Sequence, residues 1–151
     1  MKTRQLCSFR LDPLLFGVPV DPVQEVVRGH RMTAVPLAPS CVAGLINLRG
    51  QVVTVIDLRI RLGLPPRPAG SAGVHVIVRS ADGAVSLLAD EIGDVIDLDE
   101  KAFEAPPETL QGDSRELISG AYKLKGRLLL ALDLDRTLSL TAPSSPSGRA
   151  G

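Results

Sequence analysis

Two aspartates, Asp57 and Asp133, hold the positions best suited to acid–base or phosphoryl chemistry. Each follows an apolar run, VVTVI before Asp57 and LLLAL before Asp133. A strand-end aspartate is typical of phospho-accepting receiver domains, which also need alternating strands and helices and an acidic Mg²⁺-binding pair. Because the sequence offers neither, we expect Asp57 to hydrogen-bond nearby backbone. A small acid–base enzyme using both aspartates stays open as an alternative.

The remaining reactive side chains are isolated from one another. The two histidines are His30 and His75, and the two cysteines, Cys7 and Cys41, are too few and too far apart for a disulfide scaffold or a metal site. The sequence has no phosphate-binding glycine loop and no nucleophile elbow. We therefore predict no catalytic residue, no metal and no cofactor, which favours a binding protein over an enzyme.

The elements that position the aspartates are two copies of one segment. GLINLRGQVVTVIDLRIRLGL (44–64) aligns at a constant offset with GAYKLKGRLLLALDLDRTLSL (120–140). A weaker similarity relates residues 20–27 to residues 89–96, and chance remains an alternative explanation for it. Shared apolar positions and a shared turn glycine predict two lobes built on one plan. The identical positions are Gly44/Gly120, Leu48/Leu124, Gly50/Gly126, Asp57/Asp133, Leu58/Leu134, Leu62/Leu138 and Leu64/Leu140.

Short apolar or alternating runs recur along the chain and predict an all-β fold of antiparallel strands. Single helical turns are expected at 39–43 and 134–138, and tight hairpin turns at Gly50 and Gly126. The Pro- and Gly-rich segment 63–73 is expected to join the two lobes, 104–108 to be a further break, and 142–151 to be a disordered tail. The predicted strands are 6–11, 14–20, 23–28, 51–58, 74–80, 84–90, 92–98, 117–124 and 127–134.

Composition narrows the possible partners. The chain has 151 residues, a net charge of zero and 3% aromatic residues, which argues against nucleic-acid binding. It lacks a signal-peptide core and an apolar run of the roughly 20 residues that a membrane helix needs, so we expect a soluble cytoplasmic protein. Arginines gather in 28–67 and acidic residues in 90–108. This asymmetry fits either two solvated faces or an adapter with opposite faces for different partners.

Glu25 and Arg49 are the charges that we expect to pair. Glu25 lies in a strand-like run, and Arg49 lies among apolar residues just before Gly50. A charge in such surroundings is costly unless it is paired, so we hypothesise an ion pair that fixes a binding surface. The alternative is that both are solvated edge charges. The Gly50 turn would present Asn47, Leu48 and Arg49 rigidly.

Several of these motifs resemble the CheW family of bacterial chemotaxis coupling proteins. They are FRL (9–11), FGVPV (16–20), VQEV (23–26), VPLAP (35–39), GLINLRG (44–50) with VVTVIDLR (52–59), LLADEIGDV (87–95) and 120–134. The resemblance covers roughly residues 5–139. It implies a CheW-like domain over 1–141, made of two five-stranded SH3-like barrels around a shared core.

The resemblance also implies a function. The family joins the cytoplasmic tip of methyl-accepting chemoreceptors to the regulatory domain of the histidine kinase CheA, without catalysis and without inserting into the membrane. Carried over by position, receptor contact would involve Val23, Glu25, Asn47, Leu48 and Arg49. Kinase-binding residues are not assigned. Thr54 stands where the family usually has proline, and a CheW-like module in a non-chemotactic pathway, such as development or pilus and gliding control, stays open.

Overall fold

The computed structural model of the protein describes residues 3–68, 72–81, 83–99, 103–104 and 113–139. Most of these residues lie in strands. The strands are β1 (Thr3–Leu11), β2 (Leu14–Pro19), β3 (Val23–Arg28), β4 (Val42–Leu48), β5 (Gln51–Asp57), β6 (Val74–Ser80), β7 (Gly83–Ala89), β8 (Glu91–Asp99), β9 (Phe103–Glu104), β10 (Ile118–Leu124) and β11 (Arg127–Leu132). The short helices are α1 (Leu58–Arg61), α2 (Asp113–Leu117) and α3 (Leu134–Leu138).

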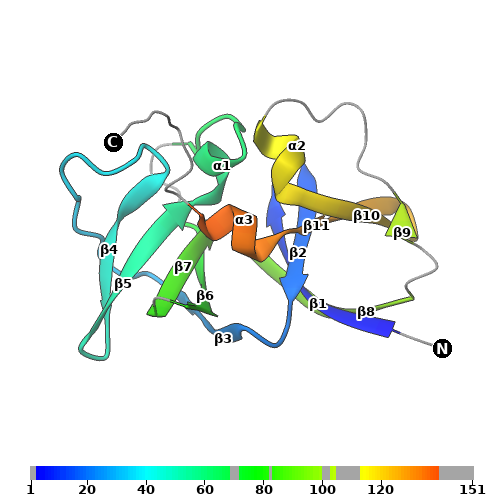
Figure 1. Ribbon diagram of the computed structural model, residues 1–151, viewed down its shortest axis with the longest axis horizontal. Coiled ribbons are helices and arrows are strands. Elements are labelled where there is room, and N and C mark those ends of the chain that lie inside the picture. The colour runs from blue at the N-terminus through cyan, green and yellow to red at the C-terminus, as the bar shows by residue number, and fades with distance from the viewer. Residues whose placement is uncertain (1–2, 69–71, 82, 100–102, 105–112, 140–151) are drawn as a thin grey trace.

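The strands form two sheets that lie side by side as two lobes, with α1 and α3 near their junction (Figure 1). One sheet has the order β3-β6-β7-β5-β4 and the other β8-β1-β2-β11-β10-β9. The prediction of an all-β fold with two SH3-like lobes is confirmed. The second sheet has six strands rather than five because the two-residue strand β9 pairs with β10.

The five-stranded lobe is inserted in the chain between β2 and β8 of the six-stranded lobe. The chain passes from the six-stranded to the five-stranded sheet between β2 and β3, and returns between β7 and β8. The expectation that 63–73 joins the lobes is therefore wrong, since the strands on either side of it, β5 and β6, belong to the same sheet. The five-stranded lobe is therefore the continuous run of strands β3 to β7, whereas the six-stranded lobe combines the β1–β2 hairpin with the later strands β8 to β11.

The sequence located most strands to within a few residues but missed β4 as a separate strand. The expected helical turn at 39–43 is wrong: the Val42 N–H bonds the Pro39 carbonyl at 2.9 Å in a turn, and β4 begins at Val42. The helical turn at 134–138 is confirmed as α3, whereas α1 and α2 were not expected. Residues 105–108 and 142–151 lie outside the described residues.

Buried apolar side chains form three clusters that explain the two-lobed shape. One lies inside the five-stranded lobe and includes Ile46, Val53 and Ile77. A second, with Leu6 and Tyr122, lies inside the six-stranded lobe. The largest joins the lobes, and its members from both sheets are Cys7, Phe9, Leu11, Phe16, Val18, Cys41, Ile56, Leu58, Leu62, Val74, Val76, Val78, Leu87, Ala89, Leu117, Ile118, Ala121, Leu130 and Leu132. The expected shared core is thus present, and its apolar burial holds the lobes together.

The internal repeat has a structural cause at the glycine pair Gly44 and Gly120. In the five-stranded lobe, Thr33 forms an isolated bridge to Leu45 on the edge strand β4. A Cβ on Gly44 would lie 2.6 Å from the Thr33 carbonyl oxygen, and one on Gly120 would lie 2.0 Å from the Phe103 ring of β9. In both lobes a glycine therefore lets a short segment lie close against the strand that carries it, β4 or β10.

In the described part of the chain, none of the helices has the length and apolar character needed to cross a membrane.

Candidate interaction surface

The β4–β5 hairpin turn holds Arg49 in a conformation that is uncommon for its residue type. Leu48 pairs with Gln51, which leaves Arg49 and Gly50 as the two central residues, with φ of 53° and 85°. Two central residues with positive φ define a type I′ turn, in which Asn and Gly are favoured. The Asn47 side chain accepts the Gly50 N–H at 2.8 Å and stabilises the turn. Non-glycine residues with strained backbone conformations cluster at functional sites, so the positive φ of Arg49 supports a functional role for its side chain.

Arg49 forms a two-point ion pair with Glu25 on β3. Its Nη1 donates to Glu25 Oε1 at 3.1 Å, and its Nη2 donates to Glu25 Oε2. The hydrogen bond from Arg49 is the main cause that lowers the pKa of the Glu25 carboxyl below its ordinary value. The Arg49 side chain is 68% exposed and that of Glu25 is 28% exposed, so the pair lies on the surface. The premise that burial forces this pairing is therefore wrong, although the two groups do meet.

The other three residues assigned to receptor contact lie around this ion pair in different environments. Asn47 is exposed, and Val23, at the start of β3, is half-buried against the shared core. Leu48 is only 5% exposed and belongs to the core of the five-stranded lobe. The alternation of side chains along β4 turns Leu48 inward. Leu48 can therefore support the turn from the core of the lobe.

An exposed apolar residue that sequence reasoning missed lies beside this turn. Val52, the residue opposite Asn47 on β5, is 63% exposed. Val26, the neighbour of Glu25 on β3, is 36% exposed. Charged groups next to exposed valines form a mixed surface that can bind protein. We call Val23, Glu25, Asn47, Arg49 and Val52 the hairpin surface.

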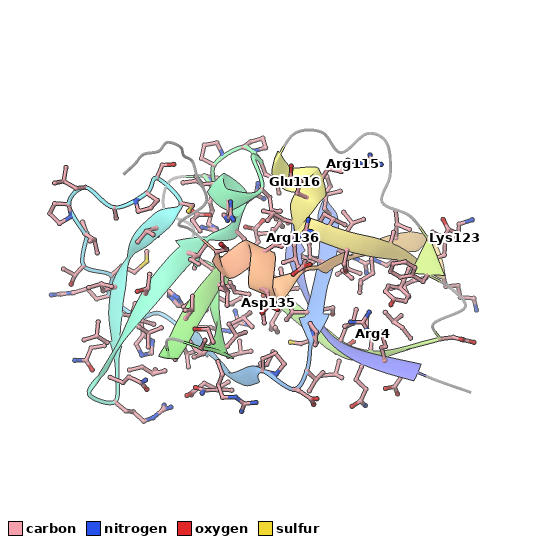
Figure 2. The ribbon with its side chains drawn as sticks, viewed as in Figure 1. Arg4, Arg115, Glu116, Lys123, Asp135 and Arg136 are labelled. Atoms are coloured by element: carbon pink, nitrogen blue, oxygen red, sulfur yellow. The ribbon has the colours of Figure 1, made fainter. Side chains whose placement is uncertain are left out.

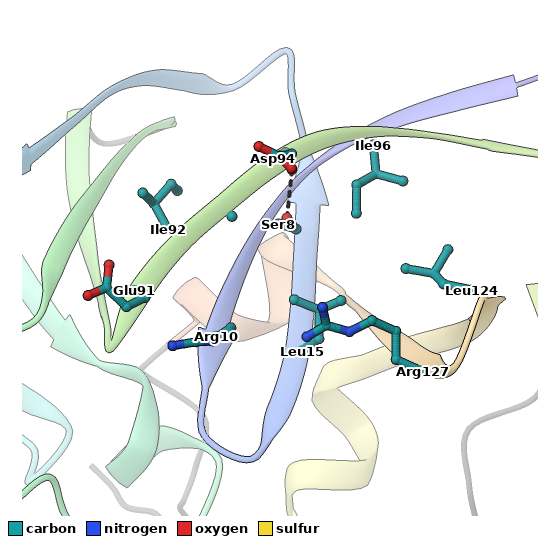
Figure 3. Close-up of a pocket in the computed structure, with 10 residues that line it drawn as sticks. Ser8, Arg10, Leu15, Glu91, Ile92, Asp94, Ile96, Leu124 and Arg127 are labelled. Carbon is teal, nitrogen blue, oxygen red and sulfur yellow. Dashed lines mark hydrogen bonds between the residues drawn. The ribbon is translucent and has the colours of Figure 1, made fainter.

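The six-stranded lobe differs at the positions equivalent to the ion pair. Under the two internal alignments, Asp94 corresponds to Glu25 and Lys125 to Arg49. In the described part of the chain no ion pair joins Asp94 to Lys125, and a pocket of about 400 Å³ opens between β8 and the β10–β11 turn. Figure 3 shows Leu124 and Arg127 on one side of it and Ile96 on another. The ion pair is thus specific to the five-stranded lobe.

The two aspartates with candidate chemistry act as helix caps. Asp57 Oδ1 accepts the Arg59 N–H at 3.0 Å at the start of α1, and Asp133 Oδ1 accepts the Arg136 N–H at 3.1 Å at the start of α3. The prediction that Asp57 bonds nearby backbone is confirmed. Among the described residues, no group of three or more His, Cys, Asp or Glu side chains could hold a metal ion.

His75 is a buried histidine of the five-stranded lobe. It is 2% exposed, and its Nδ1 lies 2.8 Å from the Ser86 hydroxyl. Burial is the main cause that lowers its pKa, and His30 and Arg67 lower it further. The His30 ring lies edge-on at 6.2 Å. This geometry is that of a satisfied core residue, since the neutral ring has its hydroxyl partner.

Sequence reasoning missed a cluster of buried charges at the junction of the lobes. Arg59 on α1 is 7% exposed, and its guanidinium donates to both carboxyl oxygens of Asp90. Arg67 Nε donates to Asp90 Oδ1 at 3.2 Å, and its Nη1 lies 3.9 Å from Asp57 Oδ2. The hydrogen bond from Arg59 is the main cause that lowers the pKa of Asp90. The sequence signal was Arg59, two residues after the helix-capping Asp57, where the second copy of the repeat has Asp135 two residues after Asp133.

Two SH3-like lobes around a shared core, with a charged hairpin surface, define a protein-interaction module. Comparison with known proteins identifies its family. The CheW-like domain family model matches residues 5–142. The chain therefore belongs to the CheW-like domain family.

Two relatives and one solved structure are similar over nearly the whole chain. Chemotaxis protein CheW of Bacillus subtilis (strain 168) is 33% identical over 141 residues, covering 93% of this chain and 90% of the relative. Probable chemotaxis protein CheW of Rhizobium etli is 29% identical, covering 91% and 89%. The crystal structure of scaffolding protein TtCheW from Thermoanaerobacter tengcongensis has a TM-score of 0.82 and 27% identity, covering 94% of this chain and 97% of that one.

Proposed function

We propose that this chain is a non-catalytic adapter that couples chemoreceptors to the histidine kinase CheA in a chemotaxis pathway. The observation that carries the proposal is the match of a CheW-like domain over residues 5–142, which includes both lobes and every described element. Relatives that are similar over nine-tenths of the chain are named chemotaxis proteins. The adapter would act in the cytoplasm, where receptor tips and the kinase meet.

The hairpin surface is the part of the chain that we assign to the receptor. Its exposed Arg49 guanidinium is held in place by Glu25 and by the type I′ turn, so little side-chain freedom would be lost on binding. Val23 and Val52 would supply apolar contact next to the charges. Leu48 would contribute indirectly, by anchoring the turn to the core of the five-stranded lobe.

The kinase would bind elsewhere, so that both partners can be held at once. We assign this partner to the regulatory domain of CheA, without assigning residues to the contact. Each interface of such an adapter is expected to be modest, near the 1,200 Å² lower limit for specific complexes. Simultaneous binding and packing into receptor arrays would then strengthen the assembly.

Binding measured with the purified full-length chain tests this proposal. We expect both a chemoreceptor cytoplasmic-tip fragment and the CheA regulatory domain to bind with micromolar affinity, about −8 kcal/mol. Arg49→Glu should weaken receptor binding at least about ten-fold, which is about 1.4 kcal/mol, and leave kinase binding unchanged. Lys125→Glu, at the equivalent turn of the other lobe, is the matched control and should bind the receptor normally. Binding of the wild-type chain to neither partner would favour a CheW-like module in a non-chemotactic pathway.

A further inference from the structure

The short helix α1 follows β5 in the five-stranded lobe, and its arginines make polar contacts with the other lobe. Arg59 donates from Nη2 to the Asp12 carbonyl, in the β1–β2 turn of the six-stranded lobe, at 3.0 Å. Its Nη1 donates to the Pro65 carbonyl at 2.9 Å, and its Nε donates to Asp90 Oδ1 at 2.9 Å. The buried Arg59 guanidinium thus forms hydrogen bonds with three separate segments of the chain.

Asp90 is the residue at which the chain crosses from the five-stranded to the six-stranded sheet. It lies between β7 and β8, and its backbone N–H donates to the Arg10 carbonyl at 3.0 Å. Its Oδ2 also accepts the Asp12 N–H at 3.0 Å. The bidentate partner of Arg59 is therefore itself tied to β1 and to the β1–β2 turn.

Arg61 makes a second, separate link from α1 to the six-stranded lobe. Its Nε donates to the Thr137 carbonyl at 3.0 Å, and its Nη2 donates to the carbonyls of Arg136 at 2.8 Å and Ser139 at 3.1 Å. These are carbonyls at the C-terminal end of α3, and that of Arg136 also accepts the Ser139 N–H at 3.2 Å. Arg61 thus holds α1 against α3.

The internal repeat makes these two arginines stand out, because the second copy of the segment lacks them. The positions equivalent to Arg59 and Arg61 are Asp135 and Thr137. Asp135 is exposed on α3, as Figure 2 shows, and Thr137 bonds within its own turn through the Asp133 carbonyl. In the described part of the chain, Asp135 and Thr137 therefore make no link like those of Arg59 and Arg61 on α1.

Two kinds of contact at the junction have different effects: apolar contacts hold the lobes together, and hydrogen-bonded arginines define their orientation. The shared core is apolar, and apolar burial is non-directional, so it holds the lobes together without defining their angle sharply. An arginine fork that meets a carboxylate and backbone carbonyls is directional. A buried ion pair contributes little net stability, and a role in specifying one arrangement is a hypothesis to be tested in each protein.

We propose that Arg59 and Arg61 form an inter-lobe clamp that fixes the angle between the two lobes, and that receptor control of the kinase depends on this fixed angle. The second half of this inference rests on the proposed adapter function. If the receptor and the kinase bind different parts of the adapter, a change in the receptor can reach the kinase only through the adapter itself. This requires the two lobes to keep a fixed orientation. The clamp residues are positioning residues that touch neither partner.

Two clamp variants and one control test the proposal. Arg59→Met with Asp90→Leu replaces the buried pair by apolar side chains, and Arg61→Gln removes the link to α3 while leaving the buried cluster intact. The control is Arg28→Gln with Glu91→Gln, which removes an exposed ion pair of 3.5 Å between β3 and β8, likewise between the lobes. If the first variant does not fold, the test rests on the comparison of Arg61→Gln with the control.

The first readout needs no partner. Spin labels at Val52→Cys and Val95→Cys, which replace residues 63% and 56% exposed on different lobes, report the distance between the lobes in the free protein. Cys7 and Cys41 are buried, and burial raises the pKa of both thiols, so the introduced cysteines react selectively. We expect the distance distribution to broaden in both clamp variants and to keep its wild-type width in the control. An unchanged width in the clamp variants would overturn the clamp.

The second readout is receptor-dependent activation of CheA by the full-length chain. We expect the clamp variants to bind each partner separately within about two-fold of wild type and to lose at least about ten-fold of the activation. Full activation despite broadened distances, or an equal loss in the control, would overturn the link between lobe angle and coupling. Failure of the wild-type chain to bind either partner would instead count against the adapter function, and the spin-label distances would still decide the clamp.

Discussion

Glu25 and Arg49 belong to opposite edges of the five-stranded sheet. Glu25 lies on β3 and Arg49 in the turn after β4, and these are the two end strands in the hydrogen-bonded order. The ion pair therefore links the sheet edges at one end of the lobe, while the Thr33–Leu45 bridge links β4 to the segment after β3. A surface made in this way depends on the curvature of the whole lobe, which explains why residues far apart in the sequence share it.

The titration of Glu25 should report the ion pair directly. Because Arg49 lowers its pKa, Glu25 in the folded protein should titrate below its ordinary value, and Arg49→Gln should return the midpoint toward that value. The stabilisation is present above the ordinary pKa and is lost as the pH falls through the lowered one. Carboxyl-carbon NMR measures both midpoints. Equal midpoints in the two proteins would show that the pair does not persist in solution.

Arg49→Asn should separate stability from binding. Asparagine tolerates positive φ better than arginine, so the turn should be as stable as in the wild type or more so. The same change removes the guanidinium, so receptor binding should fall. Chemical denaturation and a binding titration on the same sample measure the two effects. A parallel fall in both would mean that Arg49 serves mainly the fold.

Gly50→Ala should weaken the same turn through the backbone alone. Gly50 has a φ of 85°, and an added Cβ would meet no atom within 4 Å, so the cost is conformational strain. A left-handed alanine costs roughly 1–2 kcal/mol, and urea denaturation should show a loss of that size. A change near zero would indicate that the turn adopts a different conformation.

The two repeat glycines should respond differently to substitution. Gly44→Ala should cost about 1–3 kcal/mol in unfolding free energy, since its Cβ would meet the backbone carbonyl of Thr33, which cannot rotate away. Gly120→Ala should cost less, because the Phe103 ring that it meets is 43% exposed and can turn into solvent. Denaturation of the two variants side by side tests this order, and the reverse order would contradict the role given to Gly44.

Stability should also depend on pH through His75. Its pKa in the folded protein lies below the ordinary value of 6.5, so the unfolded chain binds more protons as the pH falls below 6.5. The unfolding free energy should therefore fall on acidification, by at most about 1.4 kcal/mol per pH unit. His75→Gln should remove this contribution between pH 7.5 and 5.5. The same slope in wild type and variant would mean that another group is responsible.

Much of the fold could be predicted because its signals are local. Strand alternation, the glycine turns and the repeated aspartate that begins α1 and α3 all act over a few residues. Leu48 was expected to be presented by the turn together with Asn47, whereas the alternation along β4 places the two side chains on opposite faces and buries Leu48. The pairing of Glu25 with Arg49 was predicted from the cost of burying an unpaired charge. The two groups do pair, but they lie on the surface.

The insertion of the five-stranded lobe between β2 and β8 and the Arg59–Asp90 cluster could not be predicted, since both depend on contacts between distant segments. A Pro- and Gly-rich stretch is a reasonable domain boundary by composition, whereas the actual crossings occupy the few residues around Asp21 and Asp90.

The most direct test of the adapter claim is a bridging measurement. The CheA regulatory domain is immobilised, a chemoreceptor tip fragment is added, and retention of the fragment is measured with and without the full-length chain. We predict that the fragment is retained only when the chain is present, and that Arg49→Glu abolishes retention while Lys125→Glu does not. Retention of the receptor fragment without the chain, or the failure of the wild-type chain to increase it, would contradict the account.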